Sequence, residues 1–126
     1  MEDYKNWIQI ARDDLNWTKH NLEGKIYYGA CFTAQQAAEK ILKAFLLANN
    51  QRLRKIHDLR ALLEDCILIN KDFEKLRKDT IKITPYYVQT RYPADLDLYS
   101  SYNEMQAKDA YESAKRIVKF VERKIP

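Results

Sequence analysis

Residues 25–49 constrain the fold more than any other part of the sequence, because they are apolar around more than half of a helix. Apolar side chains recur there at steps of three and four residues, and alanines widen the stripe: Tyr27, Cys31, Ala34, Ala38, Ile41, Leu42 and Phe45, with Ala30, Ala37, Ala44 and Ala48. Gln36, Glu39, Lys40 and Lys43 are left for solvent. A helix of this kind packs closely against several neighbours, so we predict the central helix of a bundle.

The rest of the chain is predicted to form further amphipathic helices with few interruptions, because there are only 2 glycines and 3 prolines in 126 residues. Apolar stripes predict helices over about 4–22, 58–67, 72–83 and from 101–103 to 125. The boundary signals are a turn at Gly24, an N-cap at Asp58, a stop or kink at Pro85, and a capping box formed by Ser101 and Glu104.

These elements predict one all-α domain over residues 1–126, an antiparallel up-and-down bundle of four main helices. The fourth helix is expected either to be kinked or to be followed by a short extra helix, because proline cannot continue a regular helix.

Composition excludes several classes of protein. No apolar run is long enough for a membrane span, and MEDYKNWIQI lacks the features of a signal peptide, so we expect a cytoplasmic protein without membrane contact. Cys31 and Cys66 are expected to be free buried thiols, and no cofactor motif or metal-ligand spacing is present, so we expect neither cofactor nor metal. A net charge of +4 permits a nucleotide or nucleic acid as partner without requiring one.

Three motifs, in this order, carry a resemblance to a known family. They are the pattern YxxACFxAQQAAEKxLKA in the central helix, HDL after the basic loop, and TRYP at 90–93. Together they resemble the HEPN domain family (higher eukaryotes and prokaryotes nucleotide-binding). The resemblance implies a small antiparallel helical bundle that is commonly dimeric. It also implies a choice of functions: metal-independent RNA endonuclease or toxin, partner of a separate minimal nucleotidyltransferase, or nucleotide binder.

The catalytic motif implied by the resemblance is an arginine followed, after four to six residues, by a histidine near the last helix. Arg91 corresponds to that arginine, but Leu96, Asp97 and Leu98 occupy the positions where the histidine belongs. Asp97 is a poor substitute base, because an ordinary aspartate is roughly two to three pKa units too acidic. Arg52 and His57 have the right spacing but lie between the second and third helices.

Two interpretations remain open for the residues that could bind a ligand. Arg91 with Tyr92 and Tyr99 could hold a phosphate and a base, or Arg91 could pair with a carboxylate such as Glu39 and be structural. The loop residues Arg52, Arg54, Lys55 and His57 could form a phosphate-binding edge, or His57 could simply brace the loop before Asp58.

We therefore predict a homodimeric module that binds a nucleotide or RNA and works with a separate minimal nucleotidyltransferase. The alternative is a metal-independent RNA endonuclease of the toxin type with a non-standard catalytic pair, either Arg91 with Asp97 or Arg52 with His57. Dimer contacts are expected from apolar side chains off the main stripes, namely Ile10, Trp17, Phe32 and Leu47.

Overall fold

The computed structural model describes residues 3–87 and 102–126, and every regular element among them is helical. The elements are α1 (Tyr4–Glu23), α2 (Tyr27–Ala48), α3 (Leu59–Ile69), the 3₁₀ segment η1 (Lys71–Leu76), α4 (Arg77–Ile83) and α7 (Glu104–Lys124). This confirms the predicted all-α bundle. No helix within the described ranges is long and apolar enough to cross a membrane.

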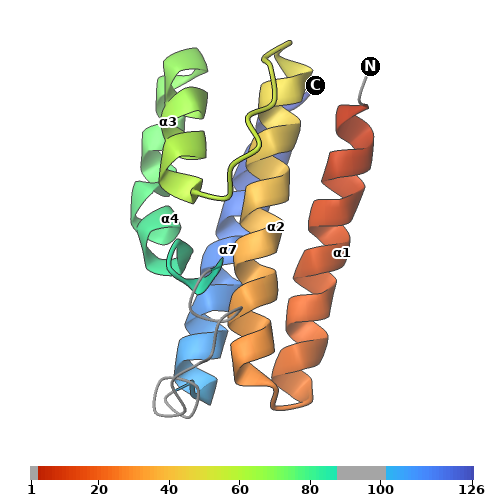
Figure 1. Cartoon of the computed structure of the whole chain (residues 1–126), viewed down its shortest axis with the longest axis vertical. Helices are drawn as coiled ribbons and strands as arrows, with labels where there is room; N and C mark the ends of the chain where they lie inside the picture. Colours follow the sequence, from red (N-terminus) through yellow and green to blue (C-terminus); the bar gives the residue numbers. More distant parts are fainter. Residues whose placement is uncertain (1–2, 88–101) are drawn as a thin grey trace.

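Three long helices, α1, α2 and α7, lie side by side, and the shorter α3 and α4 cover α2 and α7 on the side away from α1 (Figure 1). The segment between α2 and α3 runs back along α2, so α3 starts near the middle of α2 instead of at its end (Figure 1). This return path decides which side chains of α2 are covered.

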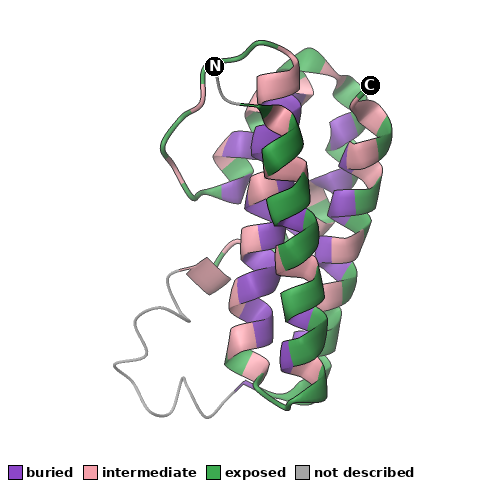
Figure 2. Cartoon of the chain, turned by 90° about the vertical axis from the view of Figure 1, so that its right-hand side faces the viewer, coloured by how far each residue is buried: buried purple, intermediate pink, exposed green. Residues whose placement is uncertain are grey.

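The core surrounds α2, as predicted for the central helix. Buried positions form the inner sides of the helices and exposed positions form their outer sides (Figure 2). Phe73 lies at the centre of an aromatic group, with its ring 4.3 Å from that of Phe45 and 5.3 Å from that of Phe120. Both cysteines are free and buried, and burial raises the pKa of the Cys31 thiol to about 12, so this thiol is not a nucleophile at neutral pH.

The expectation that Glu39 and Lys43 face solvent is wrong. Glu39 is 1% exposed and Lys43 is 5% exposed. The apolar pattern of α2 could not reveal this, because the cover comes from distant parts of the chain. The segment that returns along α2 brings His57 onto Glu39, and Trp7 of α1 lies beside Lys43. Charged side chains at such depth require a charged or hydrogen-bonding partner.

The predicted turn at Gly24 is confirmed, because α1 ends at Glu23 and Gly24, with φ −82°, is its C-cap. The residue of this turn in the left-handed region is the next one, Lys25, at φ 60°. The N-cap of α7 is Asn103, whose side chain accepts a hydrogen bond from the backbone N–H of Gln106, within the predicted start of 101–103. The predicted capping box involves Ser101, which lies outside the described residues.

The fourth helix stops just before Pro85, as predicted, but its first part is a 3₁₀ segment, which the sequence did not predict. The chain restarts at Asn70, whose side chain caps η1, and the 3₁₀ segment passes directly into α4. The expected inward residues are all buried, namely Phe73, Leu76, Thr80 and Ile83. α4 ends at Ile83, two residues before Pro85, and the expected short extra helix concerns residues that extend beyond the described ones.

Candidate functional site

The segment between α2 and α3 carries His57 back to the middle of α2. Asn50, at φ 61°, turns the chain as α2 ends, and Ile56 packs against the core. Asp58 then caps α3, because its carboxylate accepts a hydrogen bond of 3.0 Å from the backbone N–H of Arg60, as the sequence predicted. His57 is therefore held between a partly buried isoleucine and a helix cap.

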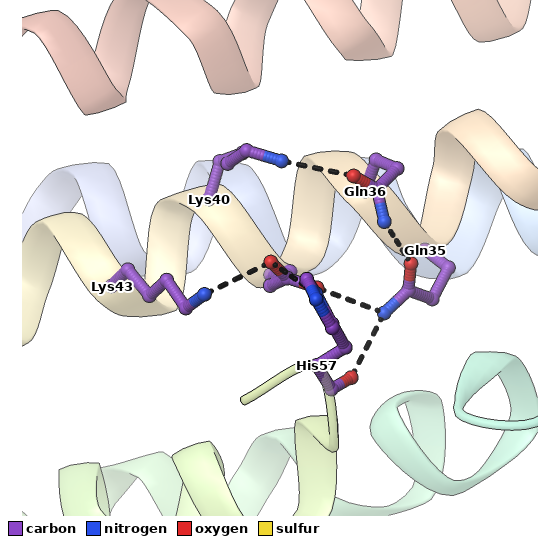
Figure 3. Close-up of polar contacts among 6 residues, drawn as sticks. Gln35, Gln36, Lys40, Lys43 and His57 are labelled. Carbon is purple, nitrogen blue, oxygen red and sulfur yellow. Dashed lines mark hydrogen bonds and ion pairs between the residues drawn. The ribbon is translucent and has the colours of Figure 1, made fainter. Parts of the chain in front are cut away.

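Glu39 is the centre of the polar cluster beneath this loop. Figure 3 shows its partners Gln35, Lys43 and His57. One carboxylate oxygen lies 3.0 Å from Lys43 Nζ, and the other accepts a hydrogen bond of 3.4 Å from the Gln35 side-chain amide. His57 Nδ1 lies 2.9 and 3.1 Å from the two oxygens. Because Lys43 offsets the charge of Glu39, the pair can be buried at an acceptable free-energy cost.

A second set of hydrogen bonds fixes the backbone of His57. The Gln35 amide also donates to the His57 carbonyl oxygen at 3.2 Å (Figure 3). Gln36 donates to the Gln35 side-chain oxygen at 2.6 Å, and Lys40 donates to Gln36 at 2.9 Å. Ring and backbone of His57 are thus both tied to α2, and His57 anchors the loop.

The ring of His57 nevertheless remains accessible, since its side chain is 47% exposed. One face stacks on the ring of Tyr87, with centroids 4.2 Å apart and planes at 12°. A cavity of about 720 Å³ opens beside these two rings and is lined also by Asp58, Arg60, Ile81, Thr84 and Pro85. Its walls come from the start of α3 and the end of α4, two segments that are distant in the sequence.

The contact with Glu39 determines which nitrogen of the His57 imidazole carries the proton. A carboxylate only accepts hydrogen bonds, so Nδ1 carries the proton that points at Glu39. Nε2 has no hydrogen-bond partner among residues 3–87 and 102–126. A neutral His57 therefore offers an acceptor at Nε2, and a charged one offers a donor for an anion.

The other predicted residues of this loop, Arg52, Arg54 and Lys55, do not line the His57 pocket. Arg52 and Arg54 line a separate cavity of about 340 Å³, together with Asp65 and Leu68. Arg54 is engaged there, because its Nε lies 3.0 Å from the Asp65 carboxylate. The structure thus places Arg52 and His57 at two different pockets, and Lys55 is exposed.

The predicted residues Arg91, Tyr92, Asp97 and Tyr99 lie outside the described residues, as does the suggested pairing of Arg91 with Glu39. Among the described residues, Glu39 is occupied by Lys43, Gln35 and His57.

Sequence reasoning missed Glu39 as the partner of His57 and Arg60 as a residue of the pocket beside it. One signal was available for Glu39: Gln35, Glu39 and Lys43 are spaced four residues apart and so share one helix face, which is typical of a polar row. No group of three or more His, Cys, Asp or Glu side chains within the described ranges is close enough to hold a metal ion.

The helical bundle gives the fold class, all-α, and comparison with known proteins gives the family. A family model described as HEPN domain matches residues 4–124. The chain belongs to the HEPN domain family, which is a family of nucleotide-binding proteins.

Solved structures agree with this assignment. TT1696 from Thermus thermophilus is 33% identical, with a TM-score of 0.85 over 98% of this chain and 99% of the other. ST0689, described as an archaeal HEPN homologue, is 28% identical, with a TM-score of 0.82 over 100% of both chains. The HEPN domain protein TM0613 from Thermotoga maritima is 24% identical and shares the fold, with a TM-score of 0.74 over 94% and 95%. Comparison with functionally curated proteins gave no match.

Proposed function

We propose that this HEPN domain protein is a homodimeric module that binds a nucleotide or a segment of RNA in the His57 pocket and works with a separate minimal nucleotidyltransferase. The observation that carries the proposal is the cavity of about 720 Å³ beside the stacked rings of His57 and Tyr87. Aromatic walls with one arginine at the rim are typical of sites that hold a base and a phosphate.

The pocket offers a separate group for each part of a nucleotide. Tyr87 and the apolar side chains of Ile81 and Pro85 suit a base, and Arg60 suits a phosphate. Asp58 does not repel that phosphate strongly, because its carboxylate lies 3.6 Å from Arg60 Nε and also accepts from the Arg60 backbone. The predicted contributions of Arg91, Tyr92 and Tyr99 stay part of the proposal. Arg52 and Arg54 line a separate cavity, so the predicted contribution of Arg52, Arg54 and Lys55 applies to an RNA that extends beyond the His57 pocket.

Fluorescence anisotropy with labelled ATP and with a short labelled RNA tests this proposal. Arg60→Gln removes the phosphate contact and should weaken binding about tenfold or more, since hydrogen bonds to charged groups contribute about 1.5–3 kcal/mol. Tyr87→Leu should weaken binding through loss of the aromatic wall. Lys5→Gln is the control for charge, because Lys5 is exposed at the start of α1. Unchanged binding in both pocket variants would rule this pocket out.

A second candidate function, metal-independent RNA cleavage, is favoured by one observation. Glu39 fixes the proton of His57 at Nδ1, which leaves Nε2 as an acceptor for a proton from a ribose hydroxyl. Arg60 lines the same pocket, whereas Arg52 lines another. The test is cleavage of RNA in excess chelator by wild type and by His57→Ala, Arg60→Ala, Arg52→Ala and Arg91→Ala. If the wild type leaves the RNA intact, cleavage is excluded and binding remains as the proposed function.

The proposed dimer is supported by exposed apolar side chains on α1. Ile10 is 42% exposed and Trp17 is 55% exposed, although α1 packs its other side against α2. We expect sedimentation equilibrium to give a dimer for the wild type and a monomer for the double variant Ile10→Glu/Trp17→Glu. A wild-type monomer at every concentration would contradict the dimer.

A further inference from the structure

A further cavity, separate from the His57 pocket and from the cavity beside Arg52 and Arg54, lies in the groove between η1/α4 and α7. It has a volume of about 280 Å³ and shares no lining residue with the His57 pocket. Its apolar part is Leu76 and Phe120, and its rim carries the charged side chains of Lys75, Asp79, Arg116, Lys119 and Arg123. Cationic groups therefore outnumber the single carboxylate at this rim by four to one.

The Asp79 carboxylate does not neutralise all four cations at the rim, because it already accepts hydrogen bonds from Arg116 and Ser113. Arg116 donates to both oxygens of Asp79, at 2.8 and 3.0 Å, and Ser113 donates to one of them at 3.0 Å. This bidentate pair satisfies Asp79 and Arg116 together. The positive charge that is left over resides on Lys75, Lys119 and Arg123.

These three cations have no ion-pair partner within the described part of the chain. Neighbouring basic residues differ in this respect: Lys82 pairs with Asp109, Lys115 with Glu112, and Lys124 with Asp72. On α7, the cations Lys119 and Arg123 thus remain without an ion pair among the described residues, and both line this cavity, although Lys119 also borders a cavity beside α1. Lys119 and Arg123 are one helical turn apart, so their like charges repel each other unless an anion lies between them.

The floor of the cavity holds its rim in position. Leu76 is buried, and the ring of Phe120 packs edge-on against Phe73 in the core, with centroids 5.3 Å apart. The stems of the cationic side chains therefore start from two helices that are fixed relative to each other. A guanidinium and two ammonium groups around one cavity can donate hydrogen bonds to the oxygens of a phosphate group.

We propose that Lys75, Lys119 and Arg123 form a second anion site, which binds a phosphate group in the groove between η1/α4 and α7. The phosphate could belong to the backbone of an RNA strand or to a small phosphorylated molecule, and the chemistry of recognition is the same for both. The site does not depend on the proposed function of the His57 pocket, because no residue is common to the two.

The test compares the wild type with Lys119→Gln/Arg123→Gln in two binding experiments. Calorimetric titration with pyrophosphate measures a small phosphate ligand, and we expect the variant to bind about tenfold more weakly. Anisotropy of labelled oligouridine between about 50 and 200 mM salt measures an RNA strand. Each lost phosphate contact lowers the slope of log K against log salt by about 0.7, so we expect a decrease of about 1.4.

The matched control is Lys5→Gln/Lys25→Asn, which removes the same number of positive charges from exposed positions on and just after α1. Asparagine is chosen at position 25 because it tolerates the left-handed conformation found there. Weaker pyrophosphate binding with an unchanged RNA slope would support the site and identify a small molecule as its ligand. A reduced RNA slope would support the site and identify a strand. If the variant matches the control in both experiments, the proposal is overturned.

Discussion

At the scale of single residues, Glu39 does most to shape the candidate site. It lies inside the bundle, pairs with Lys43 one helical turn away, and holds the imidazole of a residue 18 positions further along the chain. Lys43 is itself shielded, with its ammonium group 5.9 Å from the centre of the Trp7 ring. This ion pair lies beneath a loop, so breaking it should affect both stability and the position of His57.

The variant Glu39→Leu should therefore be strongly destabilised, because it leaves Lys43 charged and buried without its partner. The expected loss is about 3–5 kcal/mol in the free energy of unfolding. Adding Lys43→Met should recover a large part of that loss, since replacement of a whole buried ion pair is often close to neutral. Urea unfolding of both single variants and the double variant measures the coupling. Additive losses would show that the two residues do not depend on each other.

At the scale of the elements, caps and turns decide where the helices begin and end. α1, α3, η1 and α7 each start at a residue whose side chain accepts a hydrogen bond from the first turn: Asp3, Asp58, Asn70 and Asn103. Two of these boundaries can be tested by substitution, namely the N-cap of α7 and the turn after α1.

Asn103 should be the residue that caps α7. Its side-chain oxygen accepts a hydrogen bond of 2.8 Å from the backbone nitrogen of Gln106, so Asn103→Ala should cost about 1 kcal/mol of stability. Asn103→Ser keeps a capping oxygen and should lose only a small part of this. Thermal unfolding followed by circular dichroism measures the difference. Equal melting temperatures for the alanine variant and the wild type would mean that another residue caps α7.

Whereas Asn103 stabilises its helix end, Lys25 has a backbone conformation that is unfavourable for lysine and favourable for glycine. Its φ of 60° costs a side chain with a Cβ about 1–2 kcal/mol, whereas glycine adopts it freely. Glycine also lowers the free energy of unfolding by about 0.4–1 kcal/mol, because it gives the unfolded chain more conformational entropy. We expect Lys25→Gly to stabilise the protein by about 0.5–1 kcal/mol in urea unfolding, the difference between these two effects. Gly24→Ala serves as a comparison, since an added Cβ would lie 3.3 Å from the His20 carbonyl oxygen and should give no gain.

At the scale of the whole molecule, polar contacts connect layers that are far apart in the sequence. α1 and α2 share a buried hydrogen bond of 2.8 Å between the hydroxyls of Thr18 and Thr33. α4 and α7 are joined through Asp79, which binds Arg116 and Ser113. Burial alone would raise the pKa of Asp79, but the hydrogen bonds from Arg116 and Ser113 outweigh it and hold the pKa below its ordinary value.

This contact should contribute to stability only above the pH at which Asp79 takes up a proton. Because its pKa is lower in the folded than in the unfolded state, its contribution is complete at neutral pH and is lost as the pH falls from about 5 downward. We expect Asp79→Asn to be less stable than the wild type at neutral pH, with the difference shrinking in acid. Asp109→Asn is the control, since Asp109 forms only an exposed ion pair with Lys82 and should change stability little. A difference independent of pH would contradict the assignment.

The sequence by itself determined the helical architecture. Periodic apolar positions identified α1, α2, α3 and α7 and the inward residues of η1 and α4, because burial on one face of a helix leaves a pattern in nearby residues. It also determined the Asp58 cap and, through motifs spread along the chain, the HEPN family. These features depend on short spacings or on local hydrogen bonds.

Only the tertiary structure decided what surrounds His57. The contact with Glu39 spans 18 residues, and the pocket joins the start of α3 to the end of α4. Both depend on the path by which the loop returns along α2, and no local pattern encodes that path. The same holds for the cations around Phe120, since opposite charges from α4 and α7 cancel only where the two helices meet. A sequence shows which residues carry charge, but burial and pairing arise when distant segments pack together.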